Sequence, residues 1–217
     1  MPKHGWKWRT SRFRELTAQE QEDFLNDGDV FISARFAKWA YMELPLTDRA
    51  RRAAVVAIGM DFSAPWTSGF LSAELDKHWR TRLGCFIISG LGRRWEWNAA
   101  LMRRLEDLFH NPEAPPSVRG VCLHVLGHHI FPCPRGKRQA FYARLRKMCD
   151  VAIWDDVNPE MRRGACVAAS LLGGYVDRIH ELASDMSTDD LGNTVASAAE
   201  EWDFYPHAWA MEYRLDE

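Results

Sequence analysis

Two histidines with helical spacing are the residues of this sequence best suited to chemistry. His124 and His128 lie four positions apart, so on a helix they share one face and could hold a metal ion together. Cys122, His129 and Cys133 are close by, but His129 falls within the apolar arc of the helical wheel, and no acidic residue completes an HExxH pattern. Further metal ligands would have to come from elsewhere in the chain. The alternative is that these histidines pack or face a partner, and we assign no metal and no cofactor.

A second pattern is an arginine followed by small and aliphatic residues, which occurs in the segments 49–59, 79–88, 117–127 and 160–170. Its arginines, Arg51, Arg80, Arg119 and Arg162, are spaced by 29, 39 and 43 residues. Spacings of this size are typical of helical repeats. Each arginine either contacts a partner or reaches a carboxylate or carbonyl of a neighbouring repeat, and the same holds for the adjacent Arg52 and Arg163.

The third candidate is an N-terminal arm, residues 1–16, in which basic and aromatic side chains are interleaved and no acid precedes Glu15. Such interleaving suits phosphate contacts and stacking on bases. It equally suits an arm that packs back on the first repeat. The side chains concerned are Lys3, Trp6, Lys7, Trp8, Arg9, Arg12, Phe13 and Arg14.

Ten tryptophans are a high number for 217 residues, and Trp95, Trp97 and Trp154 stand beside charged residues. Exposed aromatic side chains of this kind anchor protein partners. No GxSxG, P-loop or GxGxxG motif is present, so we name no catalytic residue.

The elements that must position these residues are helices. Thr17 and Glu20 form a capping-box pattern that begins a short helix ending near Asn26. Pro45 breaks the chain, and Thr47 or Asp48 can cap the next helix. Leucines at helical spacing after Trp97 predict an amphipathic helix over 95–109. A second amphipathic helix is predicted over 140–153, with an apolar stripe at Phe141, Leu145, Met148, Cys149 and Ala152. Helices are also predicted over 30–42, 49–59, 85–88, 118–130 and 161–172, and we find no convincing strand.

Amphipathic helices thus alternate with small-residue helices that must be buried on most sides. A turn, an arginine and then an Ala/Gly-Val-Ala-Leu-Gly run resembles the second helix of a HEAT repeat, and the resemblance covers roughly residues 30–175. It implies an all-α fold: a short α-solenoid of stacked antiparallel helix pairs in a right-handed superhelix, with the second helices lining a concave binding surface. We divide the chain into the arm (1–16), a HEAT-like domain (17–184) and a C-terminal capping helix with an acidic and aromatic tail (185–217).

The composition leaves several functions open. The formal net charge of −2 gives no general attraction to nucleic acid, and no apolar run reaches the length of a membrane span. Five cysteines without CxxC spacing suit reduced thiols of a cytoplasmic protein. We therefore expect a protein-binding module, such as an inhibitor, a bacterial immunity protein that neutralises a toxin, or an adaptor, with another protein as partner. The expected partner-binding residues are Arg51, Trp95, Trp97, Arg119, His124, His128, Trp154 and Arg162.

The alternative is a nucleic-acid protein. Certain bacterial DNA glycosylases are built from HEAT-like repeats and trap a cationic damaged nucleotide with tryptophans and an aspartate. The segment Trp154-Asp155-Asp156 is similar to that arrangement in residue type only.

Overall fold

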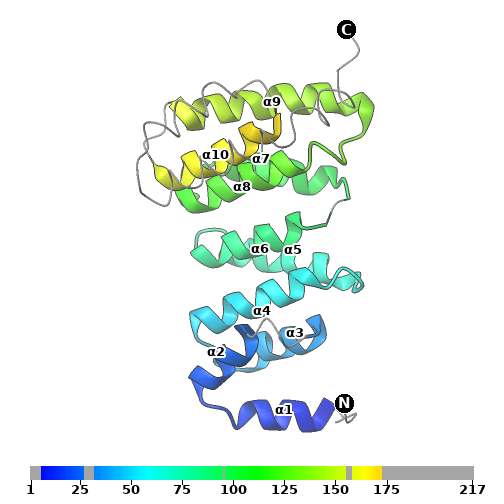
Figure 1. Ribbon diagram of the computed structural model, residues 1–217, viewed down its shortest axis with the longest axis vertical. Coiled ribbons are helices and arrows are strands. Elements are labelled where there is room, and N and C mark those ends of the chain that lie inside the picture. The colour runs from blue at the N-terminus through cyan, green and yellow to red at the C-terminus, as the bar shows by residue number, and fades with distance from the viewer. Residues whose placement is uncertain (1–5, 27–31, 95, 155–157, 173–217) are drawn as a thin grey trace. The chain divides into compact units, whose positions relative to one another are not determined.

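The computed structural model describes residues 6–26, 32–94, 96–154 and 158–172, and within these ranges the regular structure is helical throughout (Figure 1). The predicted all-α class is therefore confirmed for the described residues. The first six helices are α1 (Trp6–Arg14), α2 (Ala18–Asn26), α3 (Ala34–Glu43), α4 (Asp48–Met60), α5 (Trp66–His78) and α6 (Arg82–Gly92). The remaining helices are α7 (Ala99–His110), α8 (Pro116–His128), α9 (Arg135–Trp154) and α10 (Pro159–Leu172). No described helix combines the length and the apolarity that a bilayer crossing requires.

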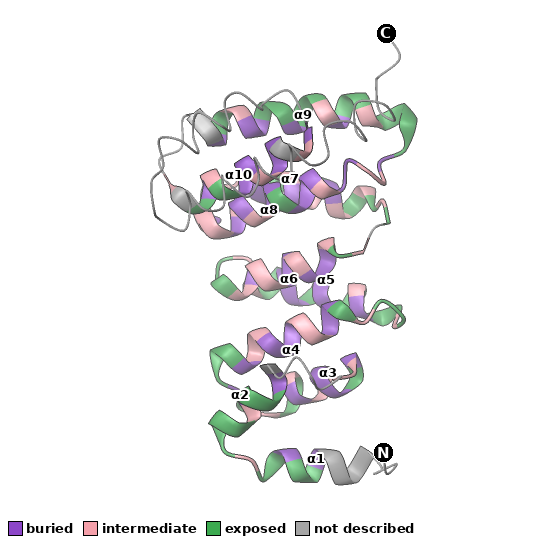
Figure 2. Ribbon diagram, viewed as in Figure 1, coloured by how far each residue is buried: buried purple, intermediate pink, exposed green. Residues whose placement is uncertain are grey.

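The chain divides into two compact units, residues 1–94 and residues 95–217, called here the first and second units. In the first unit α4 packs against α2, α3 and α6, and α5 packs against α6. In the second unit α8 packs against α7 and α10, and α9 packs against α10. Each unit thus contains two helix pairs whose second helices, α4 with α6 and α8 with α10, lie against each other. Both units contain helices with buried residues (Figure 2).

Side-chain caps fix where the helices begin. The capping box is confirmed: the Thr17 amide donates to Glu20 Oε2 at 2.8 Å, and the Glu20 amide donates to Thr17 Oγ1 at 3.3 Å. Thr47 caps α4 by accepting from the Ala50 amide at 3.1 Å. Asn158 Oδ1 accepts from the Glu160 amide at 3.0 Å at the start of α10. These short polar side chains satisfy amides that the helix itself leaves unpaired.

Small residues explain how the second helices pack together. A Cβ added to Gly59 of α4 would lie 2.7 Å from the Gly90 Cα of α6. In the second unit, a Cβ on Gly164 of α10 would overlap the backbone of Gly120 on α8. The backbones are therefore in direct contact, and a larger side chain at these positions would separate them. The sequence predicted these small-residue helices to be buried on most sides, and their direct contact buries the facing sides.

Two helices begin at other residues than the sequence predicts. The helix expected from Trp95 begins at Ala99, because Asn98 Oδ1 accepts from the amides of Ala100 and Leu101 and caps the helix there. Trp97 therefore precedes the helix, and its buried stripe is Met102, Leu105, Leu108 and Phe109. The helix expected from residue 140 begins at Arg135, although all five residues of its predicted stripe are buried.

The arginine alignment is correct for three positions and wrong for one. Arg51, Arg119 and Arg162 are each the fourth residue of their helices, α4, α8 and α10. Arg80 is exposed and lies ahead of α6, in the turn that ends with the N-cap Thr81. α6 begins with Arg82, and its fourth position, where the other three helices carry the aligned arginine, is Cys85.

Candidate binding cleft between α7 and α9

The predicted histidine pair is present on α8. The Nε2 atoms of His124 and His128 lie 3.2 Å apart, and their ring centroids are separated by 5.0 Å. His129, which the helical wheel placed in the apolar arc, is 2% exposed. Cys122 and Cys133 are also buried. Within the described residues, no three His, Cys, Asp or Glu side chains converge as metal ligands.

The two imidazoles influence each other's protonation. Desolvation by the surrounding protein and the charge that His128 would carry both lower the pKa of His124, to about 4. Because the His124 side chain is exposed, we attribute the lowered pKa mainly to repulsion between two protonated rings and less to desolvation. At neutral pH His124 is therefore uncharged.

The arginines near the starts of the second helices make contacts within their own unit. Arg119 Nε donates to the Phe109 carbonyl at 2.7 Å, and its guanidinium lies 5.5 Å from the centroid of the Phe109 ring. Arg119 thus holds the end of α7, whose last carbonyls have no partner within the helix. Arg52 Nε donates to the Asp48 carbonyl at 3.2 Å. Arg51 and Arg162 are half-buried, whereas Arg163 is exposed.

The described part of the N-terminal arm packs against the first unit. Phe13 is buried, and its ring makes edge-to-face contacts with Phe24, Phe36 and Trp39. The Arg14 guanidinium lies 5.2 Å from the Trp39 ring centroid. Phe13 is therefore unavailable for stacking on a base. The side chains of residues 3–9 lie outside the described part of the chain.

Of the three tryptophans predicted to bind a partner, only Trp97 has a described side chain. Trp95 and the side chain of Trp154 lie outside the described residues. Trp97 packs against Phe141 of α9 in an edge-to-face contact, with centroids 5.0 Å apart and planes at 83°. Its indole Nε1–H is buried and has no acceptor among the described residues. A buried donor without a partner costs free energy, so this indole gains stability if a ligand at the site accepts its hydrogen bond.

Trp97 and Phe141 are part of a cleft of about 280 Å³ on the second unit. Its charged lining consists of Arg103 and Glu106 from α7 and of Lys137 and Arg144 from α9. We call the site formed by these six residues the α7–α9 cleft. It combines aromatic side chains with three cations and one carboxylate.

The single carboxylate of the cleft is already paired. Arg144 Nε and Nη2 donate to the two oxygens of Glu106 at 3.2 and 3.1 Å, a bidentate geometry that ties α7 to α9. The Arg144 guanidinium also lies 5.8 Å from the Phe141 ring centroid. Arg103 and Lys137 are exposed, and neither has a carboxylate partner within the described residues. Two cations of the cleft are therefore available to an anionic ligand.

A buried polar cluster in the first unit is the other arrangement that could do chemistry. Glu74 of α5 is 4% exposed and accepts from the Tyr41 hydroxyl at 2.7 Å and from Lys77 Nζ at 2.7 Å. His78 Nε2 lies 3.6 Å from the same carboxylate. Desolvation raises the pKa of Glu74, but the donors outweigh it, so the pKa is lowered. Every oxygen of the carboxylate is occupied, which favours a structural role.

Sequence reasoning found Trp97 but missed the residues that surround it. The sequence pattern singled out neither Arg103 nor Glu106, and it placed Phe141 on a buried stripe. That stripe does not show that α7 and α9 lie next to each other. Comparison of the chain with family models, curated proteins and solved structures gives no match.

Proposed function

We propose that this chain is a protein-binding module, acting as an inhibitor, an immunity protein or an adaptor. The observation that carries the proposal is the α7–α9 cleft, whose lining combines Trp97 and Phe141 with two cations, Arg103 and Lys137, that have no carboxylate partner among the described residues. Aromatic and arginine side chains around a small concave site are typical of the residues that dominate protein interfaces. The free thiols of the buried cysteines suit a cytoplasmic site of action, which is part of the proposal.

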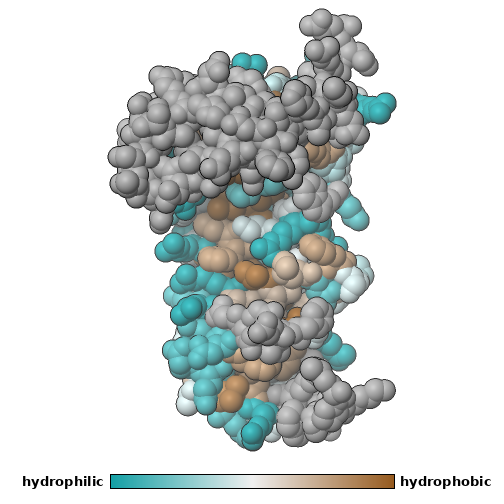
Figure 3. Space-filling view, in the orientation of Figure 1, coloured by the Kyte–Doolittle hydropathy of each residue, from teal (hydrophilic) through white to brown (hydrophobic). Residues whose placement is uncertain are grey.

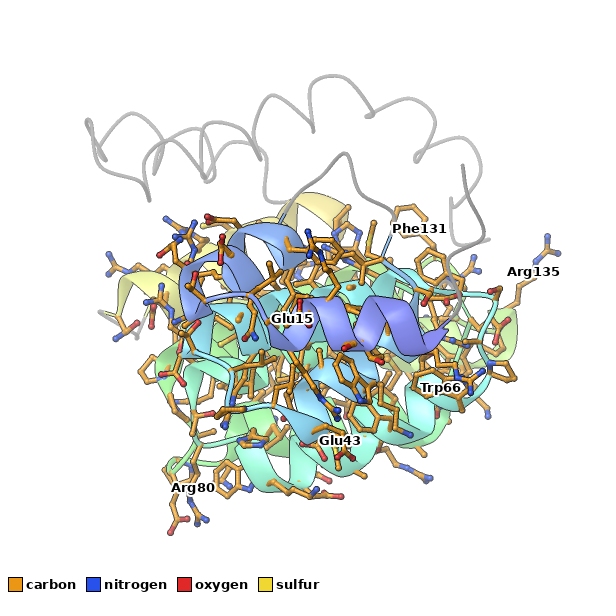
Figure 4. All side chains as sticks on the ribbon, turned by 90° about the horizontal axis from the view of Figure 1, so that it is seen from below. Glu15, Glu43, Trp66, Arg80, Phe131 and Arg135 are labelled. Carbon is orange, nitrogen blue, oxygen red and sulfur yellow. The ribbon has the colours of Figure 1, made fainter. Side chains whose placement is uncertain are left out.

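Exposed apolar side chains of the first unit support the same function. Met42, Met60 and Phe62 keep more than half of their surface in solvent, and Trp66 keeps 37%. Lys38 Nζ lies 4.8 Å from the Trp66 ring centroid. Figure 4 shows Trp66 on the same side of this unit as Glu43. On the viewed face, hydrophobic surface gathers over the middle of the first unit and hydrophilic surface lies along its left edge (Figure 3). Methionine and aromatic side chains are enriched at protein interfaces.

The basic residues give less support to a nucleic-acid protein. Arg119 and Arg52 donate to backbone carbonyls of their own unit, and Phe13 is buried. The sequence offered these arginines for contact with a partner and Phe13 for stacking on bases. A protein that depends on them for DNA or RNA would have to break its own helix contacts.

We further propose that the helix pairs are HEAT-like repeats stacked as a short right-handed solenoid. Contacts between second helices within each unit support this arrangement, as does the matching position of Arg51, Arg119 and Arg162. An experimental structure, or small-angle scattering that gives the elongated profile of a solenoid, would test the continuation from one unit to the next.

The test of protein binding is an affinity capture from a lysate of the source cells, with and without nuclease and at two salt concentrations. A stoichiometric protein that survives nuclease and salt, and that a Lys137→Glu/Arg103→Glu variant captures at least fivefold less, supports the proposal. Nucleic acid that elutes steeply with salt, with no protein, would favour the competing nucleic-acid class instead.

A further inference from the structure

We infer that the α7–α9 cleft binds an acidic segment of the partner protein, with a carboxylate held by Lys137 and Arg103. The inference rests on the proposed protein-binding function and names the partner chemistry of that site. With Arg103, Lys137 and Arg144 against Glu106, the cleft carries a formal charge of +2 in a chain whose net charge is −2. The cleft therefore has a positive formal charge, whereas the whole chain has a negative one.

The arrangement of the charges leaves room for an incoming carboxylate. Glu106 is 16% exposed and takes both of its hydrogen bonds from Arg144, so it does not neutralise the other two cations. Ala99 and Gly136 also line the cleft, in the first turns of α7 and α9. The positive ends of these two helix dipoles add to the potential that an anion meets.

Trp97 adds a donor to the same site. Its Nε1–H is buried without an acceptor, while its ring lines the cleft. A small rotation of the indole when a ligand binds would let this donor reach a carboxylate or backbone carbonyl oxygen of the ligand. An apolar side chain of the partner can pack against the Trp97 ring, which is half-buried.

The geometry favours a peptide over a nucleic acid. Phe141 is 1% exposed and meets Trp97 edge to face, so the pair does not present two open ring faces on which bases stack. A volume of about 280 Å³ accommodates one or two amino-acid side chains and lies below the usual range for larger ligands.

The hexapeptide Glu-Leu-Glu-Glu-Leu-Glu-amide, labelled with fluorescein at its N-terminal amine, tests the inference by fluorescence anisotropy with the full chain. We expect saturable binding that weakens with salt, and at least tenfold weaker binding of the peptide in which all glutamates are glutamines. Lys137→Ala and Arg103→Ala should each weaken binding about two- to fivefold, as for exposed ion pairs. Circular dichroism of each variant confirms that it is folded.

Arg135→Ala is the matched control, because Arg135 is exposed, lies beside Gly136 and projects away from the protein without lining the cleft (Figure 4). Trp97→Phe keeps an aromatic ring and removes the donor. In protein labelled with 5-fluorotryptophan, the ¹⁹F resonance missing from Trp97→Phe should shift when the peptide is added. Equal losses from Arg135→Ala and Lys137→Ala would overturn the inference.

Three other results would also overturn it: no binding of the glutamate peptide at about 1 mM protein, equal binding of the glutamine peptide, or tighter binding of a thymidine octanucleotide. The proposed function can fail separately. If lysate capture yields a protein partner that the cleft variants retain in full, the chain binds proteins through another surface and only the acidic-segment inference is lost.

Discussion

His124 and His128 illustrate how far a helical spacing can be trusted at the level of single residues. The spacing placed both side chains on one face, and their Nε2 atoms lie 3.2 Å apart. The helical wheel also separated them from His129, which is buried. A sequence cannot show whether a third ligand approaches from another element, and within the described residues none does. The consequence of the pair that can be tested is therefore its effect on the protonation of the two imidazoles.

Acid should destabilise the protein partly through this pair. The folded-state pKa of His124 is lowered from its ordinary value near 6.5. Its contribution to stability is therefore complete above about pH 6.5 and is lost as the pH falls through the lowered folded-state pKa. Between pH 7 and pH 5 the unfolded chain protonates His124 while the folded protein, with His128 beside it, does not. His124→Gln removes this difference, so the variant should gain roughly 0.5 kcal/mol relative to the wild type over this range.

Urea unfolding at the two pH values measures this difference. The control is His110→Gln, which removes an exposed histidine from α7. If both variants change by the same amount between pH 7 and pH 5, the effect belongs to histidine titration in general and the pair repulsion is refuted.

Tyr41 stabilises the buried carboxylate of Glu74 in the first unit. Its hydroxyl donates to Glu74 Oε2 at 2.7 Å, and desolvation together with this carboxylate raises the pKa of Tyr41, so the phenol remains a donor. Tyr41→Phe leaves a buried carboxylate with one donor fewer and should cost about 1–2 kcal/mol of the free energy of unfolding. Tyr142→Phe is the control, because the Tyr142 hydroxyl forms no hydrogen bond with another described residue. Its effect in chemical denaturation should stay within about 0.5 kcal/mol, and an equal loss from both variants would contradict this account.

At the scale of elements, the sequence predicted helices well where caps and apolar stripes were clear. Thr17 and Thr47 cap helices as expected, and the buried stripe of α9 was identified residue by residue. α5 was missed because its buried face carries Thr67 and Glu74 together with Leu71 and Leu75, so no apolar stripe marks it. When the hydrogen-bond partners of a polar residue lie on other elements, the sequence of its own segment does not show that the residue is buried.

The candidate site was predicted only in part for a similar reason. The spacing of Trp97 with later leucines suggested a helical position, whereas Asn98 begins the helix one residue after it. Trp97 instead packs against Phe141, which is far away in the sequence. A contact between two elements depends on how they pack, and local periodicity contains no information about it. The cleft therefore depends on how α7 packs beside α9, which the sequence pattern does not predict.

Packing of α8 against α10 should depend on Gly164. Helix propensity alone favours alanine over glycine by about 1 kcal/mol. A Cβ on Gly164 would, however, overlap the backbone of Gly120, and overpacking of this kind costs about 1–3 kcal/mol. Gly164→Ala should therefore lower the thermal midpoint. Gly136→Ala is the control, since its Cβ would meet open space in the first turn of α9, and it should be neutral or stabilising. A stabilised Gly164→Ala protein would refute the direct backbone contact.

At the scale of the molecule, each unit has a core of its own. Ile58, Leu71, Leu75 and Ile87 are fully buried in the first unit. The second unit buries another set that includes Leu105, Leu123, Phe141 and Leu145. The α7–α9 cleft takes all of its residues from the second unit. The stability of the binding site should therefore follow the stability of that unit.

Separate cores predict that damage to one unit stays local. Proteins open in cooperative segments whose free energies differ, and amide exchange reports each segment. Gly164→Ala should speed exchange in α8 and α10 by about tenfold or more, which corresponds to a local loss of about 1.4 kcal/mol. Exchange in α4 and α6 should remain within about twofold of the wild type, because these helices bury their apolar side chains within the first unit. Hydrogen–deuterium exchange with mass spectrometry makes the comparison under conditions in which the variant is folded. Faster exchange in all four helices would mean that the two units open as one, and the acidic-peptide affinity of the cleft would then depend on the first unit as well.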